Sequence, residues 1–415
     1  MRKTIYGLLF VVVCLAQTAA AQTLASYGDN VQALMARPEI TAALNFVDGN
    51  RAETLREWIA ITEINAPSGK EQKRAAYVER ILRGNKGLNV RYDSAGNLIA
   101  VRKGTGAGAA VVVDAHLDTV FQDGLQIKAD IRDGRIYAPG VGDATRNIAA
   151  MLATIRALDH ARIKTKGDLI FLFSVEEETS MRGAEEFIKE NKGKVDHFIA
   201  LDGGYEGFTY GGIGINWYKH HFVGPGGHTR SATPPYSATL ALARAIARIY
   251  ELPLSSDPPT NLNVGMLGGA EVVNAKAADA WFTVDLRSTS NEVISEMERK
   301  IAAILKEEAD KVSMTVKTEV ISTTPASQIP GHRDSHLVRT AEAVHIAAGF
   351  ERPPITITGS NNASAALLAG VSAISTGAAP CGNAHALTEW CEIEPLYKGV
   401  KKILLLQVAL AEMNF

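Results

Sequence analysis

Short, fully apolar segments alternate with helical patterns over much of the chain. The apolar runs cover residues 111–113, 169–173 and 198–201. Runs of this length without polar interruptions predict strands that are buried on both faces, as in a sheet covered by helices. Apolar residues at helical spacing predict helices at 148–158, 183–189 and 397–413. The alternation of strands and helices predicts an α/β fold.

The middle of the chain has a different pattern. Alternation of apolar and polar residues at 215–223 and a run at 280–287 predict strands, and helical spacing appears at 238–249 and 292–311. Two prolines flank polar residues at 325–330, which is typical of a hinge. We therefore expect an inserted α+β domain at residues 214–324, within a first domain formed by residues 22–213 and 325–415.

The N-terminus has the pattern of a signal peptide. Arg2 and Lys3 precede an apolar run at 8–15, and Ala19 and Ala21 fit the small-residue rule for cleavage. The run is too short to cross about 30 Å of hydrocarbon. Cleavage after residue 21 would leave a periplasmic or secreted protein rather than a membrane-bound one.

Two cysteines remain beyond the signal peptide, Cys381 and Cys391. In an oxidising compartment they could pair and close a small loop around His385. They could equally remain reduced and buried, and the sequence leaves both alternatives open.

The charge balance narrows the choice of partners. The chain has 43 basic and 45 acidic residues, a formal net charge of −2, and no long run of one sign. Nucleic acids and anionic membrane surfaces are therefore poor candidate partners.

Histidine and carboxylate side chains follow each of the three apolar runs. These residues are His116, Asp118, Glu176, Glu177, Glu178 and Asp202, and Asp143 precedes the predicted helix at 148–158. Ligands of α/β proteins bind outside the carboxyl ends of the strands. Imidazole and carboxylate ligands, with one carboxylate left free as a base, suit metal-dependent hydrolysis. Each residue alone also fits an ordinary structural role, such as a helix N-cap for Asp143, but the ordered set favours a metal site.

Five motifs in this order resemble those of the di-zinc exopeptidase and deacylase superfamily. The motifs are Asp114-Ala115-His116-Leu117-Asp118-Thr119, Gly142-Asp143, Glu177-Glu178, Asp202 and Gly382-Asn383-Ala384-His385. The superfamily includes peptidase T, glutamate carboxypeptidase, acetylornithine deacetylase and succinyl-diaminopimelate desuccinylase. The resemblance implies a zinc-exopeptidase-like catalytic domain with a helix-flanked mixed sheet. It also implies that the inserted α+β domain is a dimerisation (lid) domain, so that the protein forms a homodimer.

The resemblance assigns a role to each metal ligand. Asp143 would bridge two Zn²⁺ ions, with His116 and Asp202 on one ion and Glu178 and His385 on the other. Co²⁺ or Mn²⁺ would also suit these ligands.

Two further acids would act beside the metals. Asp118 would accept the imidazole N–H of His116 and fix its tautomer. Glu177 would be the general base. Because three glutamates follow one another, the pair Glu176 and Glu177 is an alternative register.

The resemblance also points to residues near the substrate. His228 matches a second-domain histidine that reaches across the dimer interface to stabilise the oxyanion. Asn274, Arg287, Gly359 and Ser360 match substrate-contacting positions, although an ion pair with a strand neighbour is an equal alternative for Arg287.

One departure lies next to Asp143. Relatives often continue with a second acid and glycines, whereas this chain has Ala144-Thr145-Arg146-Asn147. Arg146 and Asn147 would add bulk beside the site and reshape the pocket.

The sequence therefore predicts an exported di-zinc metallopeptidase that hydrolyses dipeptides or short peptides by a metal-bridging hydroxide. A deacylase acting on N-acyl amino acids is the alternative enzyme. A zinc-binding or peptide-binding homologue without turnover is the non-catalytic alternative.

Overall fold

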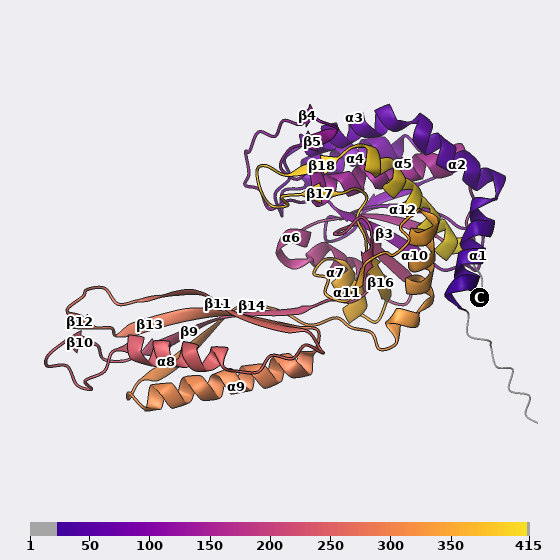
Figure 1. The fold of residues 1–415 in the computed structure, drawn as a ribbon. Helices are drawn as coiled ribbons and strands as arrows, with labels where there is room; N and C mark the ends of the chain where they lie inside the picture. Colours follow the sequence, from indigo (N-terminus) through magenta and orange to yellow (C-terminus); the bar gives the residue numbers. More distant parts are fainter. Residues whose placement is uncertain (1–22, 413–415) are drawn as a thin grey trace, which may run out of the picture.

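The computed structural model describes residues 23–412, so the expected signal peptide at 1–21 lies outside the described part. The chain forms a rounded α/β unit and an elongated unit that projects from it (Figure 1). Within residues 23–412, no helix is long and apolar enough to span a bilayer.

An eight-stranded mixed sheet is the centre of the larger unit as described. Its strands, in spatial order, are β1 (Asn89–Tyr92), β2 (Leu98–Arg102), β6 (Leu169–Ser174), β3 (Val111–His116), β7 (His197–Ala200), β16 (Ser372–Ser375), β8 (Phe208–Thr209) and β15 (Ile355–Thr356). β3 pairs in parallel with β6 and β7, whereas β1, β2 and β6 pair antiparallel. The predicted mixed sheet is therefore confirmed.

Helices cover both faces of this sheet. Val111 and Val113 of β3 belong to a core shared with one group of helices, and Val112 belongs to a second core on the other face. The first group comprises α1 (Leu24–Met35), α2 (Pro38–Gly49), α3 (Arg51–Thr62), α4 (Gln72–Arg83), α5 (Arg146–His160), α10 (His336–Ala347) and α12 (Glu394–Glu412). The second comprises α7 (Arg182–Glu190) and α11 (Ala363–Leu368). Because successive side chains alternate between two buried faces, residues 111–113 can all be apolar.

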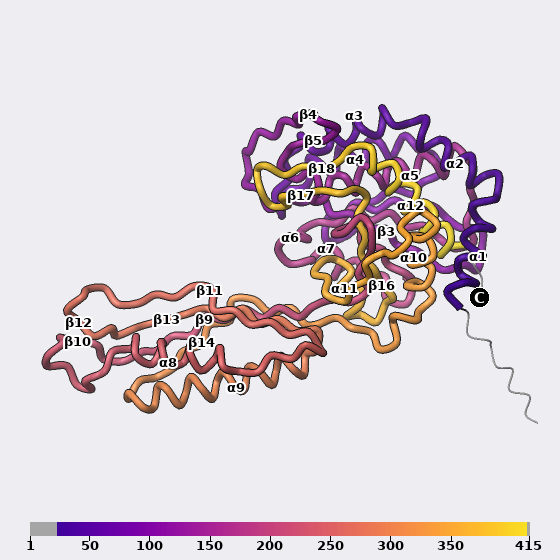
Figure 2. The backbone as a smooth tube through the Cα atoms, in the orientation of Figure 1, coloured from indigo at the N-terminus to yellow at the C-terminus, as the bar shows by residue number. Residues whose placement is uncertain are grey.

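The elongated unit is an antiparallel sheet with helices on one face. The strand order is β11 (Thr260–Gly269), β13 (Asp279–Ser288), β9 (Gly214–Val223) and β14 (Thr315–Thr324). α8 (Ala238–Tyr250) and α9 (Asn291–Asp310) pack on it around buried Phe222 and Phe282. A short ladder of β10 (Gly227–His228) and β12 (Ala275–Lys276) forms the tip farthest from the larger unit (Figure 2). The dimerisation role of this unit stays a prediction.

A second small sheet, formed by strands from the middle and the C-terminal part of the chain, contains the two cysteines. Its order is β17 (Cys381–Gly382), β18 (Trp390–Glu392), β5 (Arg135–Tyr137) and β4 (Asp130–Arg132). Cys381 and Cys391 are paired across β17 and β18 and are joined by a disulfide. The structure thus contains the paired alternative. A 3₁₀ turn, η2 (His332–Asp334), precedes α10.

Candidate metal centre

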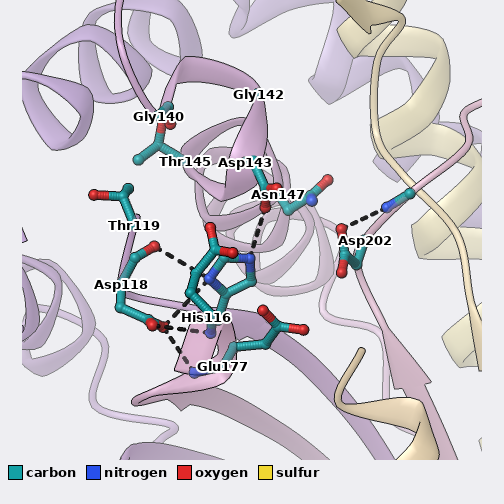
Figure 3. Close-up of polar contacts among 12 residues, drawn as sticks. His116, Asp118, Thr119, Gly140, Gly142, Asp143, Thr145, Asn147, Glu177 and Asp202 are labelled. Carbon is teal, nitrogen blue, oxygen red and sulfur yellow. Dashed lines mark hydrogen bonds and ion pairs between the residues drawn. The ribbon is translucent and has the colours of Figure 1, made fainter. Parts of the chain in front are cut away.

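The site lies where three parallel strands end. His116 is the last residue of β3, Asp202 follows β7, and α6 (Glu177–Ser180) begins shortly after β6. Asp143 lies in η1 (Val141–Thr145), where its own backbone is not helical. Parallel strands end at one edge of a sheet, so these side chains converge there. Figure 3 shows His116, Asp143, Glu177 and Asp202 around a common space.

Asp143 lies between two imidazoles. Its Oδ1 is 2.8 Å from Nε2 of His116, and its Oδ2 is 3.2 Å from Nε2 of His385. Oε2 of Glu178 is also 3.2 Å from Nε2 of His385. One ligand atom each from His116, Asp143 and Glu178 lie within 4.8 Å of one another, a spacing that a single metal ion could occupy. Each oxygen of Asp143 thus faces a different histidine, as expected of a bridging carboxylate.

Asp202 shares the electrostatic environment of this cluster. Its Oδ1 accepts the backbone N–H of Gly203 at 2.6 Å. Burial and the negative charge of Asp143 raise the pKa of Asp202, while the positive charge of His116 opposes that rise. Asp202 therefore lies within electrostatic reach of both residues, on the side of the site opposite Asp118 (Figure 3).

Asp118 links His116 to the start of α6. Nδ1 of His116 lies 3.1 Å from the backbone oxygen of Asp118 and 3.4 Å from its Oδ1. The carboxylate also accepts the backbone N–H groups of Glu177 and Glu178, at 3.0 and 3.1 Å, and the hydroxyl of Ser68 at 2.6 Å. Burial opposes its ionisation, but the contact with His116 lowers the pKa of Asp118 overall. Asp118 thus keeps Nε2 of His116 directed toward Asp143.

The three consecutive glutamates face different ways. Both oxygens of Glu176 contact the guanidinium of Arg182, with Oε1 2.5 Å from Nη2, away from the cluster. The Glu177 carboxylate points into the space beside His116 and Asp202 (Figure 3), and Glu178 lies against His385. This placement favours the register in which Glu177 and Glu178 form the functional pair.

The pKa values indicate crowded negative charge. Burial raises the pKa of Glu177 well above its usual range and that of Glu178 to about 7, with the charge of Asp143 adding to both. The hydrogen bond to Asp143 raises the pKa of His385 to about 9. Burial disfavours the charged form of His116, yet its bonds to Asp118 and Asp143 raise its pKa.

One carboxylate oxygen of the cluster lacks a partner in the described part of the chain. Oε1 of Glu178 is a buried oxygen without a hydrogen-bond partner among the described residues. Buried carboxylates are usually paired or coordinate a cation. The donor set of two imidazoles and three carboxylates therefore fits divalent metal ions.

Several predicted residues lie away from this cluster. His228 is in β10 and the backbone oxygen of Asn274 accepts the N–H of Thr229, so both belong to the tip of the elongated unit (Figure 1). Arg287 forms an ion pair with Asp285 on the same strand, with 2.9 Å between Nη2 and Oδ2. This is the alternative role expected for Arg287.

Gly359 and Ser360 lie close to the connection between the two units. Gly359 exchanges backbone hydrogen bonds with Gly211 and Ile213, and the side chain of Ser360 is exposed. Neither residue contacts the metal-binding side chains.

Glu389 is a site residue that sequence reasoning did not identify. Its carboxylate is buried and accepts backbone N–H groups from Gly140, Gly142 and Asp143. Asn147 also fixes the site, because it donates to the Leu201 oxygen at 2.6 Å and accepts from the Ala378 N–H at 3.0 Å. The only local signal for Glu389 is an acid four residues after His385.

Comparisons with known proteins agree with this geometry. The family model of peptidase family M20/M25/M40 matches residues 112–406. Carboxypeptidase G2 of Pseudomonas sp. (strain RS-16) is 27% identical over 308 residues, covering 70% of this chain and 71% of that protein. Acetylornithine deacetylase of Myxococcus xanthus is 24% identical over 322 residues, covering 73% and 80%.

Solved structures show the same fold. A tripeptidase from Staphylococcus aureus subsp. aureus Mu50 superposes with a TM-score of 0.78 at 22% identity, over 87% of this chain and 99% of that one. An aminopeptidase from Bacillus cereus ATCC 10987 gives a TM-score of 0.77 at 22% identity, over 88% and 99%. The chain therefore belongs to peptidase family M20/M25/M40, and it is a metal-dependent hydrolase of the peptidase and amidohydrolase type.

Proposed function

We propose that this chain is an exported hydrolase that cleaves dipeptides or short peptides with two bound divalent metal ions. Zn²⁺ is the ion that we expect first, and Co²⁺ or Mn²⁺ are the alternatives. The observation that carries the proposal is the position of Asp143, whose two oxygens face His116 and His385 at 2.8 and 3.2 Å. In this proposal Asp143 bridges the ions, His116 and Asp202 hold one, and Glu178 and His385 hold the other. Bound divalent ions would supply a water of lowered pKa and polarise the scissile carbonyl.

The chain's own residues would orient groups and move a proton. Glu177, whose half-buried side chain points into the space beside His116, would take a proton from the attacking water and deliver it to the leaving amine. A raised pKa suits this role, because the carboxyl group must hold the proton between the two steps. Asp118 would keep the His116 tautomer fixed.

The position of His228 at the tip of the elongated unit suggests that a second copy of the chain takes part in the site. His228 cannot serve the site of its own chain from the tip of the elongated unit (Figure 1). β11 and β14 are the edge strands of that sheet, and they expose Met266, Leu267, Val320 and Ile321. Exposed apolar edges favour pairing with another chain. We propose that residues 214–324 mediate a homodimer in which each tip carries His228 to the partner's site, with Asn274 and Arg287 assisting substrate binding.

Export is proposed from the N-terminal sequence and supported by the Cys381–Cys391 disulfide. Such bonds persist in oxidising compartments. The mass of protein purified from a periplasmic or culture fraction, with and without reductant, tests it. We expect cleavage after residue 21 and a disulfide form that is lighter than the reduced form by two hydrogen atoms, and an intact N-terminus would contradict export.

A deacylase is the second candidate, because the matched relatives include an acetylornithine deacetylase as well as a carboxypeptidase. A panel of free-amine dipeptides, tripeptides and N-acetyl amino acids separates the two. We expect hydrolysis of the peptides, loss of activity on chelation and recovery on adding Zn²⁺, Co²⁺ or Mn²⁺. Preference for the N-acetyl compounds would favour the deacylase, and bound metal without hydrolysis would favour a binding protein.

A further inference from the structure

Arg146 is a buried cation beside the site that forms no direct ion pair with any described carboxylate, although the charges of Asp143, Asp202 and Glu389 act on it. It is the first residue of α5, three positions after Asp143, and only 7% of its surface is exposed. Its Nη2 donates to the backbone oxygen of Gly203 at 2.6 Å, and its Nε is 3.4 Å from Oδ1 of Asn147. Within residues 23–412, Nη1 has no hydrogen-bond partner. One edge of the guanidinium is therefore free to bind a ligand.

The surrounding backbone holds this guanidinium in place. Asn147, the next residue, is fixed between the Leu201 oxygen and the Ala378 N–H. A Cβ atom on Gly377 would lie 2.6 Å from Nη2 of Arg146, so the guanidinium packs directly on this glycine. A side chain held in this way loses little conformational entropy when it binds a ligand.

Arg146 lines a pocket of about 470 Å³ next to the metal centre. The walls are formed by the segment from Gly203 to Thr209, which directly follows Asp202, and by Ala379, Pro380 and Cys381, on the segment that leads to His385. Glu206 also lines the pocket, but its side chain is exposed, so solvent screens its charge. Arg146 is the only cationic side chain in the lining.

We propose that Arg146 binds a carboxylate of the substrate in this pocket and thereby makes the enzyme selective for substrates with a free carboxylate near the scissile amide. This inference rests on the proposed function and names its substrate class. A guanidinium offers paired donors that match a carboxylate. A buried cation without an ion-pair partner also gains more from an incoming anion than an exposed one does. The carboxylate could be the C-terminal group or an acidic side chain.

Three peptides distinguish a C-terminal carboxylate from a side-chain carboxylate. They are Ala-Ala, its C-terminal amide, and Ala-Glu with an amidated C-terminus. Each would be assayed with wild type, Arg146→Met, Arg146→Lys and, as a matched control, Arg299→Met on the exposed face of α9. We expect Arg146→Met to lower kcat/KM for Ala-Ala about 10- to 100-fold, mainly through KM, because charge-assisted hydrogen bonds are lost. Hydrolysis of Ala-Ala amide should change by no more than about twofold.

The three peptides give different outcomes for the different roles of Arg146. A selective loss for Ala-Ala identifies the C-terminal carboxylate, and a selective loss for the Ala-Glu amide identifies the side-chain carboxylate. Equal losses for all three peptides would overturn the proposal, since a purely structural Arg146 would affect every substrate alike. Arg146→Lys keeps the charge without the planar fork, so it should retain an intermediate selectivity even if Arg146→Met folds poorly.

A binding measurement separates this inference from the proposed function. An Ala-Ala analogue with a CH₂–NH group in place of the amide cannot be hydrolysed, and calorimetry would compare its acid and amide forms. We expect the metal-loaded wild type to prefer the acid and Arg146→Met to lose that preference. If the wild type cleaves no peptide but keeps the preference, the proposed function fails while the role of Arg146 stands. Equal affinities for both forms would overturn the role of Arg146.

Discussion

Oε1 of Glu389 accepts the backbone N–H of Asp143 at 2.8 Å. The same oxygen accepts the N–H of Gly142 at 2.8 Å, and Oε2 accepts that of Gly140 at 2.7 Å. One buried carboxylate therefore shapes the loop that carries the central residue of the cluster. In Figure 3 this loop turns directly above His116.

Glu389→Gln should weaken both the fold and the metal site. The amide keeps only one oxygen and turns an NH₂ group toward backbone N–H donors, which we expect to cost about 2–3 kcal/mol of unfolding free energy. Urea unfolding and metal titration would measure the two effects. Glu392→Gln is the matched control, because that residue lies on the neighbouring strand and forms a half-exposed pair with Arg135. Unchanged metal affinity in Glu389→Gln would contradict a role in shaping the loop.

Glu177→Gln should abolish turnover without loss of metal. Removal of a general base typically costs about 10²- to 10⁴-fold in kcat, and the Glu177 side chain forms no hydrogen bond or ion pair with the other described residues, since only its backbone N–H binds Asp118. Metal content by mass spectrometry and steady-state kinetics check the two statements. Glu176→Gln is the control, since Glu176 contacts Arg182, and it should keep most of the activity. Loss of activity in Glu176→Gln alone would favour the alternative register.

Asp118→Asn should lower metal affinity about 10- to 100-fold, the usual effect of removing the partner of a metal-bound histidine. The asparagine amide is uncharged and has only one oxygen, so His116 would lose the negative charge beside its Nδ1, and α6 would lose one of the two oxygens that accept its first N–H groups. Competition with a chelator measures the affinity. Asp123→Asn, an exposed residue paired with Lys70, should bind metal as the wild type does. Equal affinities for the two variants would remove Asp118 from this role.

His345 should make stability depend on acidity. Burial lowers its pKa to about 3, and the positive charge of Lys402 adds to this effect. Between about pH 6.5 and 3 the unfolded chain binds a proton here that the folded chain does not, so unfolding free energy falls as pH falls, by at most about 1.4 kcal/mol per pH unit. His345→Gln cannot bind this proton, so the stability difference between wild type and variant should shrink below pH 6.5. Chemical denaturation at a series of pH values tests it, and parallel curves would contradict it.

The sequence predicted the elements whose burial leaves a regular pattern. β3, β6 and β7 each contain an apolar run because both faces are covered, and β9 and α9 show clear alternation or helical spacing. β14 was not predicted, because nearly all of its side chains are exposed and many are polar. β11 was also not predicted, since it contains glycines at 265, 268 and 269 and follows a loop with prolines.

The residues of the site also fall into those that the sequence predicted and those that it did not. His116, Asp143 and Glu178 stand in recognisable positions after strands or before a helix, and they converge in the structure. Glu389 left no such signal, because it contacts backbone N–H groups of a loop far away along the chain. The free edge of Arg146 likewise depends on neighbours contributed by Gly203 and Gly377, which only the fold brings together.

The long insertion between β8 and β15 affects the order of events during synthesis. His116 and Asp143 leave the ribosome well before the elongated unit, whereas His385 and Glu389 follow it near the end of the chain. Domains fold as their residues become available, so a nascent chain that ends before residue 385 contains the carboxylates of the cluster but only one of its two histidines. The full set of candidate metal ligands is therefore present only in a nearly finished polypeptide.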